Sequence, residues 1–386
     1  MKTLLSALTG RRARHTRDSS APAPAAPALP RGLAALREQV LEHGLSRERA
    51  QALADALEDD GRLYEAIEML TRANRLRRDA VIERRIARLR RAAFATLDRS
   101  LPPPPWPPFV PEDLPGAADH PPIVTSQEVT PGLVRNGILR HGSVLVRGLV
   151  PPARAARLRH AIDRAFEAYD ATDAGRATPE MVQWFDPIED IPDAGIVRSW
   201  GRKGQGVFAA DSPRALFEFL ETVHEIGLDE LITGYLGERP ALSVEKTTLR
   251  LVDTATQHPE WHQDGAFLGG GVRTVNAWFA LSHCGRDAPG LDVIPQRVPR
   301  VFATGQTGDA ETFFDWVVSA ETIARELPGV QVWRPEFQAG DVLLFDHVTL
   351  HRTANSPAMP NPRYAIESWF FAPSVYPSKG STPIIV

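Results

Sequence analysis

Cysteine is almost absent from this chain of 386 residues, in which Cys284 is the single one. One cysteine excludes a disulfide within the chain and a zinc site built from several thiolates. It also fits a reducing compartment, because disulfides persist in oxidising ones. The sequence SHCG around Cys284 favours the buried end of a strand over a reactive nucleophile.

Long apolar runs and an excess of one charge are also missing. No segment approaches the ~20 apolar residues that span a bilayer. The formal net charge is −4, from 44 basic and 48 acidic residues, so neither nucleic acid nor an anionic membrane is an expected partner. We therefore expect a cytoplasmic protein that acts on a small molecule.

The N-terminus, MKTLLSALTGRRARHTRDSS, is basic and contains a brief apolar patch from Leu4 to Leu8. This patch is shorter than the apolar core of a secretory signal, which is about 7–15 residues long. The arginines also suit an organellar transit peptide. Because Ala, Arg and Pro are abundant throughout the chain, we favour a disordered leader.

Composition divides the chain into four parts. Residues 1–30 form a basic and Pro/Ala-rich leader, and residues 31–100 place apolar residues at helical spacing among charges. Residues 101–122, LPPPPWPPFVPEDLPGAADHPP, are a proline-rich linker that acts as a semi-rigid spacer. Residues 123–386 carry short strand-like segments and form the expected main domain.

The helical part contains a stretch, ALADALEDDGRLYEAIEMLTRANRLRRDAVIERRIARL, that resembles a tetratricopeptide repeat. Gly61 and Arg62 mark the expected break between two antiparallel helices. Only one copy is present, whereas a solenoid needs about three repeats to bury a continuous core. We expect a small all-α module or an arm packed on the main domain, with a possible docking surface for a protein partner.

The C-terminal part is rich in short β-prone segments. Strands are expected in HGSVLVRGLV, SVEKTTLRLV, VRTVNAWFALS, LDVIPQ, VQVWRP, GDVLLFDHVTL and RYAIESWFFAP. Helices are expected in PPARAARLRHAIDRAFEAYD and around ALFEFLETVHEIGLDELITGYLG. The pattern predicts an α+β fold, a β-barrel or sandwich buttressed by helices.

The stretch PEWHQDGAFLGGG contains two metal-ligand side chains, His262 and Asp264. In a strand, residues two apart point to the same face, so the imidazole and the carboxylate would project together. Such a pair is half of the 2-His-1-carboxylate triad that holds non-haem Fe(II) and leaves coordination positions open. By itself the HxD pattern is a weak signal, and a second histidine is needed.

Four histidines downstream or nearby compete for the third position. His258 precedes a proline and is expected in a loop, and His283 follows a strand. His347 and His351 both follow the strand GDVLLF. His351 lies where the chain would return to the site, whereas His347 suits a supporting position.

A keto acid that serves such a site needs a cation for its distal carboxylate, and arginine supplies bidentate charge-assisted hydrogen bonds. Arg363 opens the strand RYAIESWFFAP, twelve residues beyond His351. A strand, a turn and an antiparallel return would place it one strand from the metal.

Taken together, HQD, VNAWFALS, LDVIPQ, GDVLLFDHVTLHRT and RYAIESWFFAP resemble the phytanoyl-CoA dioxygenase family of Fe(II)/2-oxoglutarate oxygenases. The resemblance covers roughly residues 130–375. It implies a double-stranded β-helix (a jelly-roll, cupin-like fold) with flanking helices. It also implies that three residues bind iron and three line the 2-oxoglutarate site: His262, Asp264 and His351 for iron, and Arg363, Trp278 and Thr353 for the co-substrate.

The family's activity implies hydroxylation of a small organic metabolite, coupled to conversion of 2-oxoglutarate to succinate. The expected requirements are Fe(II), 2-oxoglutarate and O2, with ascorbate as a stimulant. Halogenating relatives have Ala or Gly in place of Asp264, so retention of the carboxylate favours C–H oxidation. The segment from about 170 to 215 is expected to cover the pocket. The alternative is a catalytically silent domain of the same fold that binds a metabolite or a protein.

Overall fold

The structure is a computed structural model that describes residues 31–100, 103, 105–106, 120–188, 194–253, 260–268, 271–304, 316–376 and 382–386. The leader 1–30 and most of the proline-rich linker lie outside these residues. The part of the chain that the structure describes is a mixed α/β protein with a large, mostly antiparallel sheet and several helices. None of its helices combines the length and the apolar character needed to cross a membrane.

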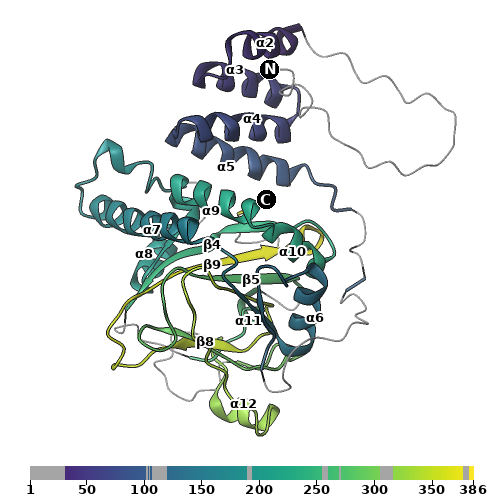
Figure 1. Cartoon of the computed structure of the whole chain (residues 1–386), viewed down its shortest axis with the longest axis vertical. Helices are drawn as coiled ribbons and strands as arrows, with labels where there is room; N and C mark the ends of the chain where they lie inside the picture. Colours follow the sequence, from purple (N-terminus) through teal and green to yellow (C-terminus); the bar gives the residue numbers. More distant parts are fainter. Residues whose placement is uncertain are drawn as a thin grey trace, which may run out of the picture.

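Four helices precede the sheet and are stacked one upon the next (Figure 1). They are α2 (Arg31–His43), α3 (Arg47–Asp59), α4 (Leu63–Leu76) and α5 (Ala80–Ala95). The break between α3 and α4 falls at Gly61, whose φ of 71° favours glycine. Ser46 and Asp79 cap α3 and α5 by accepting hydrogen bonds from backbone N–H groups in the first turn. The expected helices at 31–95 are therefore present; their assignment as a tetratricopeptide repeat stays a prediction.

The large sheet has the strand order β1-β2-β7-β5-β9-β4-β10, with β3 paired to β4. Its strands are β1 (Ile123–Thr125), β2 (Ser143–Arg147), β3 (Gly206–Phe208), β4 (Ala241–Val252), β5 (Thr274–Ala280), β7 (Val342–Phe345), β9 (Arg363–Phe371) and β10 (Pro383–Ile385). Only β1 and β2 run parallel. Strand β9 is central, because it pairs along its length with β5 on one side and β4 on the other.

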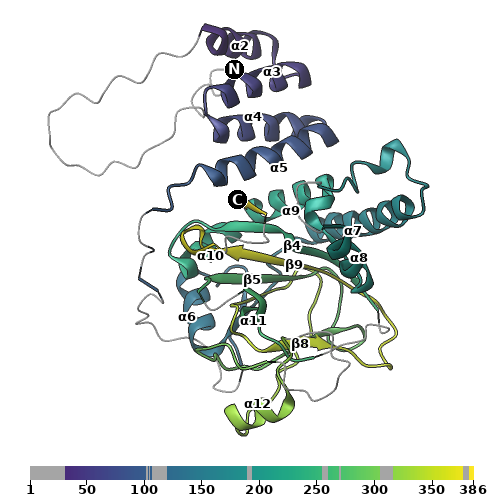
Figure 2. The same cartoon turned by 180° about the vertical axis from the view of Figure 1, so that it is seen from behind.

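A second, two-stranded sheet pairs β6 (Gly290–Val293) with β8 (His351–Ala354). It lies below the large sheet in Figures 1 and 2. Apolar side chains of both sheets form one buried cluster, which includes Trp278, Leu343 and Ala365 from the large sheet and Leu291 and Val293 from the small one. The face of the large sheet that carries Trp278 and Ala365 therefore looks toward the small sheet.

The opposite face of the large sheet is covered by helices, and Ile366 and Phe370 pack there. The covering helices are α6 (Pro131–His141), α7 (Pro152–Asp173), α9 (Pro213–Glu225) and α10 (Leu228–Leu236). The single helix expected over 215–237 is wrong, because Gly227 adopts a φ of 64° and separates α9 from α10. The strand expected in VQVWRP is also wrong: Trp333 forms only an isolated bridge with Val293.

The helical segment packs directly on the sheet domain. Its buried side chains, including Ile86 and Phe94, share one hydrophobic cluster with Phe217 of α9, Phe371 of β9 and Tyr376. The Tyr376 ring lies 5.2 Å from Phe94 and 4.9 Å from Phe371. A shared core of this kind fixes the four helices to the far end of the central strand.

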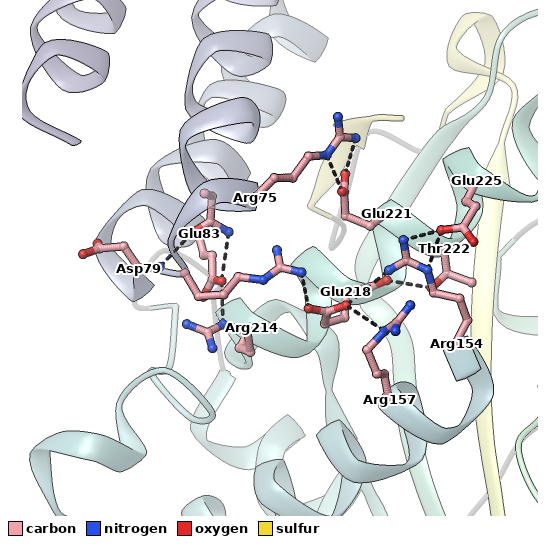
Figure 3. A network of polar contacts seen from close by, with 12 residues as sticks. Arg75, Asp79, Glu83, Arg154, Arg157, Arg214, Glu218, Glu221, Thr222 and Glu225 are labelled. Carbon is pink, nitrogen blue, oxygen red and sulfur yellow. Dashed lines mark hydrogen bonds and ion pairs between the residues drawn. The ribbon is translucent and has the colours of Figure 1, made fainter. Parts of the chain in front are cut away.

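Polar contacts reinforce this interface, and Figure 3 shows that they gather along α9. Arg75 donates to both carboxylate oxygens of Glu221, at 2.6 and 2.9 Å. In the other direction, Arg214 of α9 donates to the Glu83 carboxylate of α5 at 2.5 Å, and Asn74 donates to the same oxygen at 3.0 Å. Because Glu83 is 2% exposed, its charge depends on these two partners.

The expected cover segment is only partly helical. It contains η1 (Pro179–Met181), α8 (Ala194–Lys203), β3 and η2 (Ala209–Asp211). Arg198 of α8 donates to Asp211 at 2.7 Å, and Arg84 of α5 donates to Asp186 at 2.9 Å. The helical segment therefore contacts this segment as well as packing on the sheet. Phe185 and Val207 pack on the helix-covered face of the large sheet, so the role of the segment as a cover of the pocket stays a prediction.

We predict that Glu83→Ala lowers the free energy of unfolding by roughly 3 kcal/mol, because it leaves the largely enclosed Arg214 guanidinium without its carboxylate. The measurement is urea-induced unfolding followed by circular dichroism. Glu58→Ala is the matched control: Glu58 pairs with Arg85 from a side chain that is 46% exposed, and its loss is expected to cost about 1 kcal/mol or less. Equal effects of the two substitutions would contradict the prediction.

Candidate metal and co-substrate site

A pair of backbone hydrogen bonds joins the two histidines that the sequence singled out. His262 N–H donates to the His351 carbonyl at 3.1 Å, and His351 N–H donates to the His262 carbonyl at 3.1 Å. His351 begins β8, but His262 forms isolated bridges to His351 and Val317 rather than belonging to a regular strand. The mutual bonds bring the two imidazole rings to a centroid separation of 4.3 Å.

Asp264 does not share a strand with His262, which corrects the expectation from the HxD spacing. It lies in the turn that leads into a short helix, α11 (Gly265–Leu268), and its carbonyl accepts from Leu268 N–H. This turn packs closely on Val301. A Cβ at position 265 would lie 2.6 Å from Val301 Cγ2, so glycine fits here without displacing that side chain. The turn still points the carboxylate inward, where Asn276 of β5 donates to it at 3.4 Å.

The three side chains converge on one point. A ligand atom from each of His262, Asp264 and His351 lies within 4.8 Å of the others, and the Asp264 carboxylate is 3.8 Å from His351 Nε2. Asp264 and His351 are buried, and His262 is partly buried. Two imidazoles and one carboxylate on one side of a point are a facial donor set for a divalent metal.

Hydrogen bonds to the far side of each ring fix the histidines for this purpose. His262 Nδ1 lies 3.1 Å from the Glu260 carbonyl, and His351 Nδ1 lies 3.0 Å from the Thr349 carbonyl. A carbonyl can only accept, so each Nδ1 carries the proton and each Nε2 keeps its lone pair. The site thus presents two nitrogen donors without any rearrangement.

Burial sets the charges of the cluster. Desolvation, with the neighbouring His351, lowers the pKa of His262 to about 4, and burial also lowers the pKa of His351. Burial raises the pKa of Asp264 to about 6, although His262, Asn276 and Lys246 oppose the rise. At neutral pH the site holds two neutral imidazoles and one carboxylate, which are the protonation states that bind a metal.

The competing histidines do not join this cluster. His258 lies outside the described residues, and among the described ones only the three named above form a metal-ligand group. His347 is buried, but its contribution is structural, because its carbonyl accepts from Gly265 N–H at 2.7 Å. Cys284 is buried as well, and desolvation raises the pKa of its thiol to about 12, which leaves it unreactive at neutral pH.

Arg363 begins the central strand β9 and is 2% exposed. Its guanidinium lies over the Trp278 ring at 5.3 Å and donates to the Gly290 carbonyl at 3.2 Å. Among the described residues, neither Arg363 Nε nor Trp278 Nε1 has a hydrogen-bond partner. Buried donors are nearly always paired, so these two N–H groups mark a place for an acceptor from outside the chain.

Glu367 explains why Arg363 remains available, and sequence analysis missed it. Its carboxylate is 3.7 Å from Arg363, but it accepts two closer bonds from Arg250, at 2.9 and 2.8 Å. Burial alone would raise the pKa of Glu367, yet Arg250 and Arg363 bring it below its ordinary value. Glu367 therefore pairs mainly with Arg250, and Arg363 has no carboxylate at hydrogen-bonding distance.

Trp278 and Thr353 are the two further residues expected in the co-substrate site. Trp278 faces the space between the sheets beside Arg363, but it also packs on Phe337 at 4.7 Å, as a core residue would. Thr353 lies two residues after His351 on β8 and so shares its face. Its partner across the small sheet is Leu291. The roles of both residues toward a co-substrate stay predictions.

Gln263 and Asp346 hold the segments that carry the ligands. Gln263 is fully buried and points away from the metal ligands: it donates to the Arg300 and Val348 carbonyls and accepts from Phe302 N–H. Asp346 accepts from Tyr235, Arg297 and Thr349, at 2.8, 3.0 and 3.1 Å. These bonds fix the turn from β7 to His351.

The donor set fits Fe(II), because two neutral imidazoles and a carboxylate leave half of an octahedron open. The buried arginine fits a carboxylate at hydrogen-bonding distance from its unpaired Nε. Both features lie between the same two sheets. A metal centre with a separate anion anchor is the arrangement of an oxygenase that uses a keto acid.

Comparison with known proteins agrees with this class. The sequence profile of phytanoyl-CoA dioxygenase (PhyH) matches residues 138–359. The chain therefore belongs to the phytanoyl-CoA dioxygenase family. A search of curated protein sequences finds no significant match.

Solved structures that resemble the chain are distant in sequence. The carbocyclase SnoK of nogalamycin biosynthesis, a non-haem α-ketoglutarate-dependent enzyme, has 14% identity and a TM-score of 0.43, over 64% of this chain and 85% of its own. EvdO2 from Micromonospora carbonacea var. aurantiaca, complexed with 2-oxoglutarate, has 18% identity and a TM-score of 0.44, over 66% of this chain and 91% of its own. EctD from S. alaskensis, with 2-oxoglutarate and 5-hydroxyectoine, has 17% identity and a TM-score of 0.45, over 64% of this chain and 77% of its own.

We predict that Fe(II) affinity falls about tenfold for each pH unit below the Asp264 pKa of about 6. A raised pKa means that the metal-free carboxyl keeps its proton up to that pH, so the metal must displace it. His262, with a pKa of about 4, stays neutral at pH 5 and adds no competition. Anaerobic equilibrium dialysis at pH 5, 6 and 7.5 measures the effect.

Asp264→Asn is the control for this prediction. It should bind Fe(II) more weakly at every pH, with a flatter dependence between pH 5 and 7.5. An affinity of the unmodified protein that is constant over this range would show that Asp264 does not carry the competing proton.

Proposed function

We propose that the protein is a non-haem Fe(II)- and 2-oxoglutarate-dependent dioxygenase that hydroxylates a small organic metabolite. The observation that carries the proposal is the His262–Asp264–His351 cluster together with a buried arginine that has an unpaired N–H, on the face of the large sheet that looks toward the small one. Either feature alone has other uses. Their combination on facing sheets, in a chain of this family, supports a metal and a keto acid bound side by side.

Each residue has a role that follows from its contacts. His262 and His351 would bind iron through Nε2, because the carbonyls of Glu260 and Thr349 hold their Nδ1 protons. Asp264 would supply the carboxylate. Bound Fe(II) and 2-oxoglutarate supply the oxidising chemistry, with O2 as oxidant and with succinate and CO2 as products.

Arg363 would bind the distal carboxylate of 2-oxoglutarate and orient the keto acid toward the metal. Trp278 supplies an apolar wall beside the guanidinium and a second unpaired donor, its Nε1–H. Thr353 is a further candidate for this anchor. The apolar cluster around Trp278 excludes water from this end of the site, which strengthens the ion pair.

We further propose that the two sheets are the walls of a double-stranded β-helix, with residues 123–386 as the dioxygenase domain. The packing of Trp278 and Ala365 against Leu291 and Val293 supports this arrangement. The helical segment 31–100 would then be an accessory module. Because this module packs on α9 and β9, it would stabilise the sheet domain. Its outer helices would offer a surface to a protein partner.

A catalytically silent domain that binds a metabolite or a protein is the alternative. An intact donor set with neutral histidines speaks against it, because a binding module has no need of a metal-competent site. Ascorbate dependence would separate the two further, since a reductant matters only to a turning-over iron enzyme.

We predict that the protein releases succinate from 2-oxoglutarate under air with Fe(II) and ascorbate, even before its substrate is known. His262→Ala should abolish this release because it removes an iron ligand. Arg363→Ala should raise the KM for 2-oxoglutarate roughly 10- to 100-fold, the effect of losing a charge-assisted pair of about 1.5–3 kcal/mol. Succinate and KM are measured by chromatography.

Arg334→Ala is the matched arginine control. Arg334 pairs with Asp292 from a side chain that is 43% exposed, and its removal should leave succinate release unchanged. If neither succinate release nor anaerobic binding of Fe(II) with 2-oxoglutarate is found, the silent binding domain becomes the better account.

A further inference from the structure

Three aromatic side chains gather beside the proposed iron site: Phe267, Trp316 and Trp369, here called the aromatic cluster. Phe267 and Trp369 are stacked, with ring centroids 5.2 Å apart and planes inclined by 20°. Trp316 meets Phe267 edge to face at 5.6 Å. Phe267 belongs to α11, three residues after Asp264, so the cluster is tied to the metal-ligand turn by a single short helix.

The cluster is partly open to solvent. Phe267 is 38% exposed and Trp316 is partly buried, whereas Trp369 is partly buried and also packs against the core shared with the helical segment. Most large aromatic rings of the sheet domain are fully buried, among them Phe279, Phe345 and Phe370. Exposed apolar area next to a candidate active site is the expected mark of a surface that a ligand covers.

Lys246 completes the surface. Its ammonium lies 5.8 Å from the Phe267 ring and 5.9 Å from the Trp369 ring. The register of β4 and β9 shifts between Ser243 and Thr248, and Lys246 lies within that irregularity. Within the described part of the chain Lys246 forms no ion pair, although its charge acts on the nearby Asp264 carboxylate. An ammonium with no carboxylate in direct contact is available to an anionic group.

The order of residues along the sheet places this surface on the substrate side of the metal. Trp278 and Glu367 face each other across β5 and β9, and the Arg363 guanidinium lies at their level. Two residues further along the same strands, and on the same face, Asn276 lies opposite Trp369. Asn276 also contacts Asp264. The co-substrate anchor therefore lies on one side of the metal ligands, and the aromatic cluster lies on the other.

We propose that the aromatic cluster and Lys246 form the substrate-recognition surface, and that the substrate is a planar, ring-bearing acid. Its ring would stack against Phe267 and Trp369, and its carboxylate or other anionic group would pair with Lys246. This inference rests on the proposed dioxygenase function, because it assigns the substrate class of that same site.

The other charges of the site support an anion at Lys246 rather than a cation elsewhere. Asp264 faces the metal position, and Glu367 is held by Arg250, so neither is free to bind a positively charged substrate. Phe267 and Trp369 already stack on each other, so a ligand ring would meet the open part of this stack, and a flat ring suits aromatic faces and edges better than an alkyl chain.

The test uses three probes on the full-length protein with Fe(II) and 2-oxoglutarate under anaerobic conditions: 3-phenylpropionate, 3-phenylpropionamide and 3-cyclohexylpropionate. Ligand-observed NMR titration gives a Kd for each. We expect 3-phenylpropionate to bind at least about fivefold more tightly than either comparison compound, in line with the separate contributions of stacking and charge.

Variants assign the effect to residues. Lys246→Met should remove the preference for the acid over the amide, and Lys246→Arg should retain it. Phe267→Leu should remove the preference for the phenyl over the cyclohexyl ring, whereas Phe267→Tyr should retain it. Tyr64→Leu, at a 51% exposed position on α4, is the control for replacing an exposed aromatic ring. Circular dichroism melting verifies that each variant folds.

The outcomes separate the two proposals. Ring and charge preferences that disappear in the matching variants support the substrate class. Equal binding of all three probes, binding that does not respond to Lys246 and Phe267, or no binding of any probe overturns it. The dioxygenase function is judged independently, by Fe(II)- and Arg363-dependent succinate release, which needs no substrate and none of these residues.

Discussion

The reciprocal backbone hydrogen bonds between His262 and His351 are the constraint on which the site depends. They join two segments that are 89 positions apart in the numbering and set both imidazoles at one end of the small sheet. The side chains then need only one further bond each, from Nδ1 to a carbonyl, to present Nε2 inward. Asp264 follows because α11 begins directly after it. The candidate metal site is thus built mainly by main-chain geometry.

Much of this was predictable from sequence. Apolar spacing indicated α2 to α5, and the order of HQD, GDVLLF and RYAIESWFF indicated the residues that the structure brings together. The errors have local causes: a glycine with positive φ splits α9 from α10, and α11 begins directly after Asp264 where period-two spacing predicted a strand, with Gly265 leaving room for Val301. Glu367 and Arg250 were missed because their pairing joins different strands. A charged residue at an inward position of a central strand, as at Glu367, is the signal that would have found them.

The helical segment takes part in the same framework although it lies outside the family match. It covers Phe371 at the end of β9, the strand that begins with Arg363, and it contacts the segment around Asp186 through Arg84. Its interface combines a shared apolar core with partly exposed ion pairs, of which the Glu83–Arg214 pair is the most enclosed. Such an interface is closer to the interior of a domain than to a contact between tethered units.

The central position of β9 has a consequence for how firmly the two halves of the site are held. Arg363 belongs to a strand hydrogen-bonded on both sides, whose amides can exchange with solvent only when the sheet itself opens. His262 and Asp264 belong to an isolated bridge and a turn, where opening disturbs few bonds. Arg363, the proposed keto-acid anchor, therefore lies in a strand that we expect to exchange slowly, whereas His262 and Asp264, two of the proposed metal ligands, lie on a less firmly bonded edge. A bound ion would cross-link that edge to β8, so hydrogen exchange around 260–268 would report on metal occupancy.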